Sequence, residues 1–240
     1  MAIGGVLHTV IPPQRPDPKW GQPERPLFSP AATTIYRIAL FGGVLLLSLS
    51  GVTAYAYFHS TYWNRVGLAQ LQPILFSHRH HAGELHIDCR NCHATVETSA
   101  FAGMPSTRTC LACHSQLFAT TTMIHPLVES LASNVPLQWT RVNQLPAHVY
   151  FNHGVHVAKG VACTTCHGEV GAMALTAKGE PLTMRWCLNC HKDPGPRLSL
   201  PRDLFSPLSP VALPARAPPD LMAFYHVRTE SLTDCSTCHH

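Results

Sequence analysis

The ten cysteines of this 240-residue chain all fall into one pattern, in which two cysteines stand three positions apart and a histidine follows at once. This CxxCH pattern is the attachment motif of c-type haem. The two thiols add across the two haem vinyl groups, and the adjacent histidine then lies beneath the iron as its proximal axial ligand. We number the patterns as frames 1 to 5 along the chain: Cys89-Cys92-His93, Cys110-Cys113-His114, Cys163-Cys166-His167, Cys187-Cys190-His191 and Cys235-Cys238-His239.

Other uses of paired cysteines explain the frames less well. Zinc sites combine two CxxC pairs, or one pair with two spaced histidines, and give no reason for a histidine after every second cysteine. A disulfide framework does not require such histidines either, and a thioredoxin-like centre needs one CxxC pair. The sequence therefore predicts five covalently bound haem c groups.

An internal repeat surrounds the frames and supplies further histidines. Module one, residues 76–114, and module two, residues 151–191, each open on F-x-H-x-x-H and then carry two frames. A third, shorter unit, residues 224–240, opens on F-x-H, has Thr229 at the place of the second histidine, and carries one frame. Each module with two frames thus has two leading histidines, and the unit with one frame has one leading histidine.

This arithmetic predicts one distal iron ligand for each haem, with the first histidine of each unit serving the frame that follows it. Histidines at positions i and i+3 share a face of a helical turn, so one turn can present two imidazoles to neighbouring haems. Each imidazole must be neutral at its iron-binding nitrogen, with the other nitrogen held by a hydrogen bond. We expect the leading phenylalanine to pack on a porphyrin. The distal candidates are His78, His81, His153, His156 and His226; the alternatives left open are Met184, His125 and His148, then His80, His86 and His240.

A membrane anchor is predicted ahead of the frames. Residues 38–58 form an uncharged apolar run, which as a helix rises about 31 Å, enough to cross the hydrocarbon core of a bilayer. Tyr62 and Trp63 follow it, as interfacial aromatic residues do. We predict a transmembrane helix at residues 35–62. A cleaved signal peptide, suggested by the AYA triplet at 54–56, disagrees with the length of the segment before the run.

Two arguments orient this helix. Basic residues are more frequent on its N-terminal side, at Arg15, Lys19, Arg25 and Arg37, than just after it, at Arg65 and Arg79. Covalent haem attachment also takes place on the outer side of the cytoplasmic membrane. We therefore expect a Pro-rich cytoplasmic tail at residues 1–34 and a periplasmic or extracellular haem domain at residues 63–240.

Composition adds limits on partners. Charged residues make up 12% of the chain and form no basic run, which argues against a nucleic-acid partner and favours a surface covered by partner subunits. Seven of the 21 prolines lie in the tail and eight in a connector at residues 194–220. We expect both segments to be extended, the connector acting as an arm that wraps the surface or as an idle spacer.

The predicted fold follows from the small amount of polypeptide. The haem domain offers about 36 residues for each haem, too few for an ordinary apolar core, so the haems must replace it. The predicted fold class is a single N-terminal transmembrane helix plus a multihaem cytochrome c domain of short helices and loops wrapped around five haems, with little or no sheet. No Ser-His-Asp, phosphate-loop or paired-carboxylate motif is apparent. Closely spaced six-coordinate haems predict electron transfer and no catalytic residue in this chain.

The phrases around the frames also carry a resemblance. The anchor, five frames, and the segments "FAGMPSTRTCLACHS", "VYFNHGVHVAKGVACTTCHG" and "PLTMRWCLNCHK" resemble the pentahaem cytochrome c subunit of alternative complex III, over roughly residues 36–240. The resemblance implies an electron-transfer subunit of a quinol:electron-acceptor oxidoreductase. Polytopic subunits would oxidise menaquinol, beside an iron–sulfur subunit and a monohaem cytochrome c. The pentahaem subunit would relay electrons toward a soluble acceptor, such as a cytochrome or a copper protein.

Two other functions stay open on the sequence. A stand-alone, single-anchor multihaem quinol dehydrogenase would meet quinol at its own membrane-proximal haem and feed a reductase. A multihaem nitrogen-oxide enzyme would need one haem with an open iron position. The nitrite reductases of that class often replace one CxxCH by CxxCK, and this chain has no CxxCK.

Overall fold

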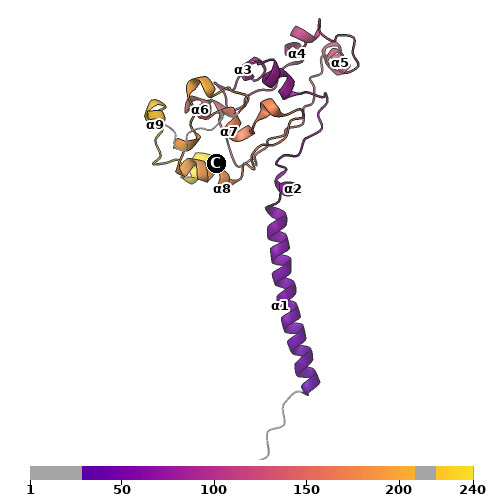
Figure 1. Ribbon diagram of the computed structural model, residues 1–240, viewed down its shortest axis with the longest axis vertical. Coiled ribbons are helices and arrows are strands. Elements are labelled where there is room, and N and C mark those ends of the chain that lie inside the picture. The colour runs from indigo at the N-terminus through magenta and orange to yellow at the C-terminus, as the bar shows by residue number, and fades with distance from the viewer. Residues whose placement is uncertain (1–28, 209–219, 240) are drawn as a thin grey trace, which may run out of the picture. The chain divides into compact units, whose positions relative to one another are not determined.

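The computed structural model describes residues 29–208 and 220–239 (Figure 1). Most of the predicted tail, residues 209–219 of the connector, and His240 lie outside these ranges. The described chain divides into two units, one ending at Tyr55 and the other beginning at Ala56. Each unit is described by itself.

The first unit is the greater part of one long helix, α1 (Pro30–Phe58). Ser29 caps its start, because the Ser29 hydroxyl accepts a hydrogen bond from the Ala32 amide at 3.2 Å. Proline is tolerated in a first helical turn, where its missing N–H has no partner to lose. The helix therefore begins five residues before the predicted boundary at residue 35 and takes in the end of the predicted tail.

Helix α1 is long and apolar enough to cross a membrane, judged by length and composition, and none of its residues is buried within the structure. Its end at Phe58 comes four residues before the predicted boundary at residue 62. There Ser60 caps the short helix α2 (Thr61–Asn64), whose Trp63 amide donates to the Ser60 hydroxyl. Trp63 packs edge-on against Phe58, with ring centroids 4.9 Å apart, so aromatic side chains gather at this end of the helix.

The second unit consists of short helical turns joined by long loops, as Figure 1 shows. The described ranges contain isolated β-bridges and no sheet. The predicted fold class is thus confirmed. After α2 the elements are η1 (Arg79–Glu84), α3 (Cys89–Cys92), α4 (Thr107–His114), α5 (His125–Ser133), α6 (His153–Ala158), α7 (Cys163–His167), η2 (Val170–Ala172), α8 (Met184–Lys192), η3 (Gly195–Arg197), η4 (Pro201–Asp203), α9 (Asp220–Phe224) and α10 (Cys235–Cys238).

The apolar core of this unit is small. Its one hydrophobic cluster of buried residues among those described joins Leu198, Leu221 and Tyr225. The Tyr225 hydroxyl donates to the Ser199 carbonyl at 2.9 Å, which ties the chain on both sides of residues 209–219 to one place. Leu198 and Leu204 are buried, so the described part of the connector packs into the domain and is not an idle spacer.

Close contacts between helical turns hold parts of the two modules in place. The π-helical turn η1 packs on the 3₁₀ turn η2, and a Cβ atom at Gly83 would overlap the Gly171 carbonyl oxygen. Helix α4 packs on α5, where the Thr107 and Ser130 hydroxyls lie 2.8 Å apart. Contacts of η1 with η2 place the leading turn of module one against the segment that follows frame 3.

Candidate haem sites

Each frame lies on a helical turn. Frames 1, 3 and 5 begin the short helices α3, α7 and α10, while frames 2 and 4 lie at the ends of α4 and α8. A helical turn places residues i and i+3 on one face, so both thiols of a frame are presented to the same cofactor. None of the ten cysteines forms a disulfide bond, so both sulfur atoms of every frame are available for a cofactor. Within the described residues, no cluster of three or more histidines, cysteines or acids could hold a bare metal ion.

The leading turns of the two modules have the same internal geometry. Phe76 stacks on His81, with ring centroids 4.5 Å apart, and meets His78 edge-on at 4.8 Å. Phe151 stacks on His156 at 4.2 Å and meets His153 edge-on at 4.9 Å. The phenylalanine therefore packs between the two candidate imidazoles. The contact that the sequence predicts between this phenylalanine and a porphyrin stays a prediction.

Four pairs of imidazoles face each other at a distance that suits a metal ion between them. Two imidazoles on opposite sides of one metal ion place their ring centres about 6 Å apart, from a metal–nitrogen bond of about 2 Å and about 1 Å from nitrogen to ring centre on each side. The observed centroid distances are 6.1 Å for His81 and His114, 6.3 Å for His153 and His167, 6.2 Å for His156 and His191, and 5.6 Å for His148 and His239.

Hydrogen bonds to backbone carbonyls fix which nitrogen of these rings is available. A carbonyl oxygen can only accept, so an Nδ1 atom next to one carries the proton and leaves Nε2 with a free lone pair. Such support is typical of histidines that bind metals. The Nδ1 donors and their acceptors are His81 to Ser77 (2.9 Å), His153 to Ala100 (2.7 Å), His156 to Asn152 (2.8 Å), His93 to Gly103 (2.7 Å), His114 to Leu117 (3.2 Å), His191 to Leu232 (2.7 Å) and His239 to His148 (3.3 Å).

His78 lies close to His93, the proximal histidine of frame 1. Burial, and to a smaller extent the charges that His93 and His81 would carry, lower the pKa of His78 to about 4. Its Nδ1 atom lies 3.0 Å from the Thr176 hydroxyl, in the segment after frame 3. His78 is thus held neutral, the form that can bind a metal ion.

His167, the proximal histidine of frame 3, has a side-chain partner that the sequence analysis missed. Its pKa is lowered to about 4, first by burial and then by the neighbouring histidines. The Asn143 amide nitrogen lies 3.0 Å from its Nδ1 atom, while the Asn143 Oδ1 atom is buried without a partner. A half-turn of this amide satisfies both groups, since Oδ1 then accepts from Nδ1–H. No local pattern marks Asn143, because it lies 24 residues before His167.

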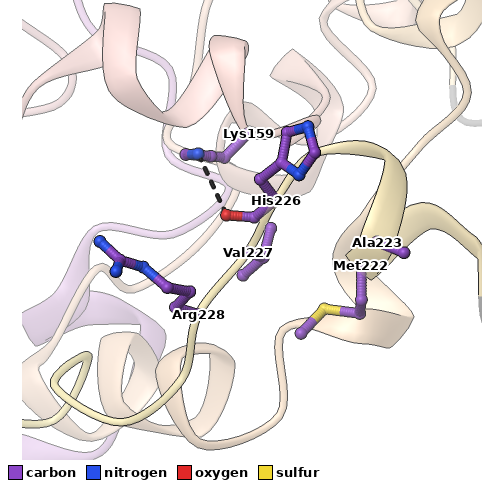
Figure 2. A pocket seen from close by; sticks show the side chains of 6 residues that line it. All are labelled: Lys159, Met222, Ala223, His226, Val227 and Arg228. Carbon is purple, nitrogen blue, oxygen red and sulfur yellow. Dashed lines mark hydrogen bonds between the residues drawn. The ribbon is translucent and has the colours of Figure 1, made fainter.

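The remaining candidates lie elsewhere. His226 lines a surface pocket of about 720 Å³. The Lys159 ammonium group donates to the His226 carbonyl at 3.2 Å, and Figure 2 marks this bond with a dashed line. His148, and not His226, forms the ring contact with His239 among the described residues. Met184 is exposed at the start of α8, and His125 lies at the start of α5 with its ring 4.0 Å from the Glu129 carboxylate.

Comparison with known proteins agrees with this chemistry. Residues 149–240 match the family model of cytochrome c7 and related cytochrome c. The chain carries a multihaem cytochrome c domain. CxxCH patterns in such domains bind haem c covalently, so the match implies that this domain carries covalently bound haem c.

A relative of the multihaem cytochrome is the menaquinone reductase, multiheme cytochrome c subunit, of Nitratidesulfovibrio vulgaris. It is 35% identical over 97 residues, which are 40% of this chain and 45% of the relative. The chain thus spans less than half the length of the curated relative that it matches.

Proposed function

We propose that this chain is a membrane-anchored pentahaem c-type cytochrome that conducts electrons within a quinone-linked membrane complex. The observation that carries the proposal is the set of facing imidazole pairs at the spacing of a bis-histidine iron site. With His78 and His93 as the fifth pair, each frame has its proximal histidine and one distal histidine.

The cysteines and imidazoles of each site would keep its haem iron in one coordination state. Haem c, when bound, supplies a reversible one-electron couple. The two cysteines of each frame would hold one haem by thioether bonds, and the paired imidazoles would bind its iron. An iron bound by two imidazoles would offer no place for a substrate, which argues against a nitrogen-oxide enzyme. The potentials are set by axial ligands, burial and the hydrogen bonds at Nδ1.

The anchor and the sequence resemblance support a place in the membrane. We propose that α1 spans the cytoplasmic membrane, with residues 1–34 inside and the haem domain on the periplasmic or extracellular side. The sequence resemblance to alternative complex III supports partners of four kinds: polytopic quinol-binding subunits, an iron–sulfur subunit, a monohaem cytochrome c and a soluble acceptor. Each menaquinol oxidised by the complex releases two electrons and two protons, and the acceptor takes the electrons one at a time.

The relative supports a second direction of flow. It is named a menaquinone reductase subunit, whereas the resemblance to alternative complex III implies quinol oxidation. In the reductive direction, a reduced soluble carrier would deliver two electrons, and menaquinone would take them up with two protons. The bis-histidine sites serve either direction, because they conduct and do not bind quinone.

Purification from the native membrane tests both points. We expect the chain to carry five haems by intact mass, to show low-spin signals in EPR spectroscopy, and to co-purify with polytopic and iron–sulfur subunits. A menaquinol analogue should reduce its haems in the complex and not in the isolated chain. Reduction in the isolated chain would favour the stand-alone dehydrogenase. Menaquinone reduction by a reduced carrier, without haem reduction by quinol, would establish the second direction. Fewer than five haems would overturn the proposal.

A further inference from the structure

We propose that the five frames follow one another in space in the order 2–1–3–4–5, so that frames 2 and 5 are the two ends of the haem chain. The inference rests on the proposed function, because it assumes that each frame and its imidazole pair hold one haem. It concerns the placement of residues of this chain and goes beyond what the order of the sequence implies.

Frames 2 and 1 are neighbours because they share one turn. His81 faces His114 of frame 2, while His78, three residues earlier, lies beside His93 of frame 1. Phe76 contacts both leading imidazoles, so the two distal ligands are held together as one body. The same relation holds in module two, where His153 faces frame 3 and His156 faces frame 4. Frames 3 and 4 are therefore neighbours too.

Frame 1 contacts module two through the loop that follows it and through its distal histidine. The loop after frame 1 accepts hydrogen bonds from histidines of both modules. The Gly103 carbonyl accepts from His93 Nδ1–H of frame 1. The Ala100 carbonyl accepts from the Nδ1–H of His153, which faces frame 3. Thr176, after frame 3, lies 3.0 Å from the distal His78 of frame 1. The contacts of His153 with Ala100 and of His78 with Thr176 connect the two modules through frames 1 and 3.

The first cysteines of frames 1 and 3 also meet at one segment. The Cys89 thiol lies 3.5 Å from the Phe205 carbonyl oxygen, and the Cys163 amide donates to the Leu204 carbonyl at 3.1 Å. Frame 2 instead lies at the end of α4. This helix packs on α5, which belongs to neither module.

Frame 5 lies next to frame 4. The Nδ1–H of His191 in frame 4 donates to the Leu232 carbonyl, three residues before frame 5 begins. On the other side, Tyr150 precedes the leading turn of module two; its amide donates to the Cys238 carbonyl at 3.1 Å and its hydroxyl to the Ser236 carbonyl at 2.8 Å. Frame 5 is therefore held by module two, and the His191 bond places it beside frame 4.

Exposure supports the two ends independently. Of the ten cysteines, all described, only Cys113 of frame 2 and Cys235 of frame 5 are exposed, and the other eight are partly covered. Cofactors at interior positions of a row are covered by neighbours on both sides, and those at its ends are not. Partners that exchange electrons with this chain would therefore approach frame 2 and frame 5.

The direct test is the set of iron positions in a cryo-EM map of the unmodified complex from the native membrane. We expect the frame 1 iron to lie between the irons of frames 2 and 3, and the frame 5 iron to be nearest to that of frame 4. A frame 2 iron closer to frame 3 than the frame 1 iron is would overturn the order. Intact mass on the same sample separates the two proposals, because five haems in another order would leave the proposed function standing.

Light-driven reduction gives a second readout. A ruthenium photoreductant can be attached to a cysteine introduced by Leu117→Cys, since Leu117 is 57% exposed and adjoins His114 of frame 2. In the full chain we expect the electron to spread from frame 2 over all five haems. Adding Cys89→Ser and Cys92→Ser, which remove the frame 1 attachment, should trap it at frame 2. Continued reduction of frames 3 to 5 in this variant would contradict the order.

Discussion

The leading turns of the two modules and the start of the third unit share the F-x-H sequence but not its geometry. In the modules, Phe76 and Phe151 each pack against the imidazoles that follow them. In the third unit, Phe224 packs edge-on against Tyr225 at 4.8 Å, and His226 adopts a left-handed backbone conformation with φ of 49°. The third unit therefore has the sequence of a leading turn, but its phenylalanine packs on a tyrosine where the modules have histidines.

The difference shows when a repeated F-x-H sequence predicts the imidazole that faces the following frame. A turn with two histidines has two frames to serve, and its phenylalanine holds both rings. The third unit lacks the second histidine, and its Tyr225 is buried in the apolar cluster with Leu198 and Leu221. The ring that faces His239 comes instead from His148, which lies 91 residues before it. A contact between distant segments, and not a local turn, therefore brings an imidazole to frame 5.

The largest expected effect comes from removing the imidazole that faces frame 5. His148→Ala should leave one of the five haems without its distal ligand, and that haem should change from low-spin to high-spin. The measurement is low-temperature EPR of the oxidised protein, with haem content checked by mass. His226→Ala is the matched control and should leave all five haems low-spin. The reverse pattern would restore the equivalence of the three units.

A second comparison concerns the close contact of Gly83, in the leading turn of module one, with the Gly171 backbone of module two. Gly83 follows His78 by five residues, as Ala158 follows His153 in module two. Gly83→Ala places a methyl group on the Gly171 carbonyl, and overpacking of this kind costs about 3 kcal/mol. We expect a lower guanidinium concentration to break the histidine–iron bonds of frames 1 and 2 first.

The reciprocal change, Ala158→Gly, is the control for this substitution. It should cost less than about 1 kcal/mol, the helix propensity difference between the two residues. If Gly83→Ala proved as mild as Ala158→Gly, η1 and η2 would not be in the contact described.

The phenylalanines provide a third and smaller test. Phe151→Leu removes two ring contacts of an aromatic kind, which together stabilise a structure by about 2 kcal/mol. We expect earlier loss of low-spin haem at frames 3 and 4 in a guanidinium titration followed by absorbance. Phe224→Leu, at a side chain that is 59% exposed, should leave the titration unchanged. Equal effects of the two changes would mean that the third unit also uses its phenylalanine as a support.

The sequence could predict what depends on local spacing. The frames, the two histidine turns and the absence of a sheet follow from patterns a few residues long, because a helical turn fixes which side chains share a face. The pairing of His148 with His239, the order of the frames and the Asn143 contact with His167 join segments 24 to 91 residues apart. Such pairings are decided by how loops without periodicity close around the sites, and a single sequence carries no signal for them. The start of α1 was missed because prolines in the tail suggested an extended chain, although Pro30 fits a first turn.

The smallest expected effect is a shift in reduction potential when the hydrogen-bond partner of His167 or of His78 is removed. An acceptor at Nδ1 makes an imidazole a stronger ligand, which stabilises the oxidised iron and lowers its reduction potential. Asn143→Leu removes the acceptor for His167, so the potential of the frame 3 haem should rise by about 40 mV, the equivalent of one hydrogen bond of about 1 kcal/mol. Asn143→Asp offers a charged acceptor and should lower the same potential. Thr176→Val, beside His78, is the comparison in module one and should act on frame 1 alone. An EPR-monitored redox titration resolves these shifts, and a rise in both Asn143 variants would mean that the side chain acts by packing instead of as an acceptor.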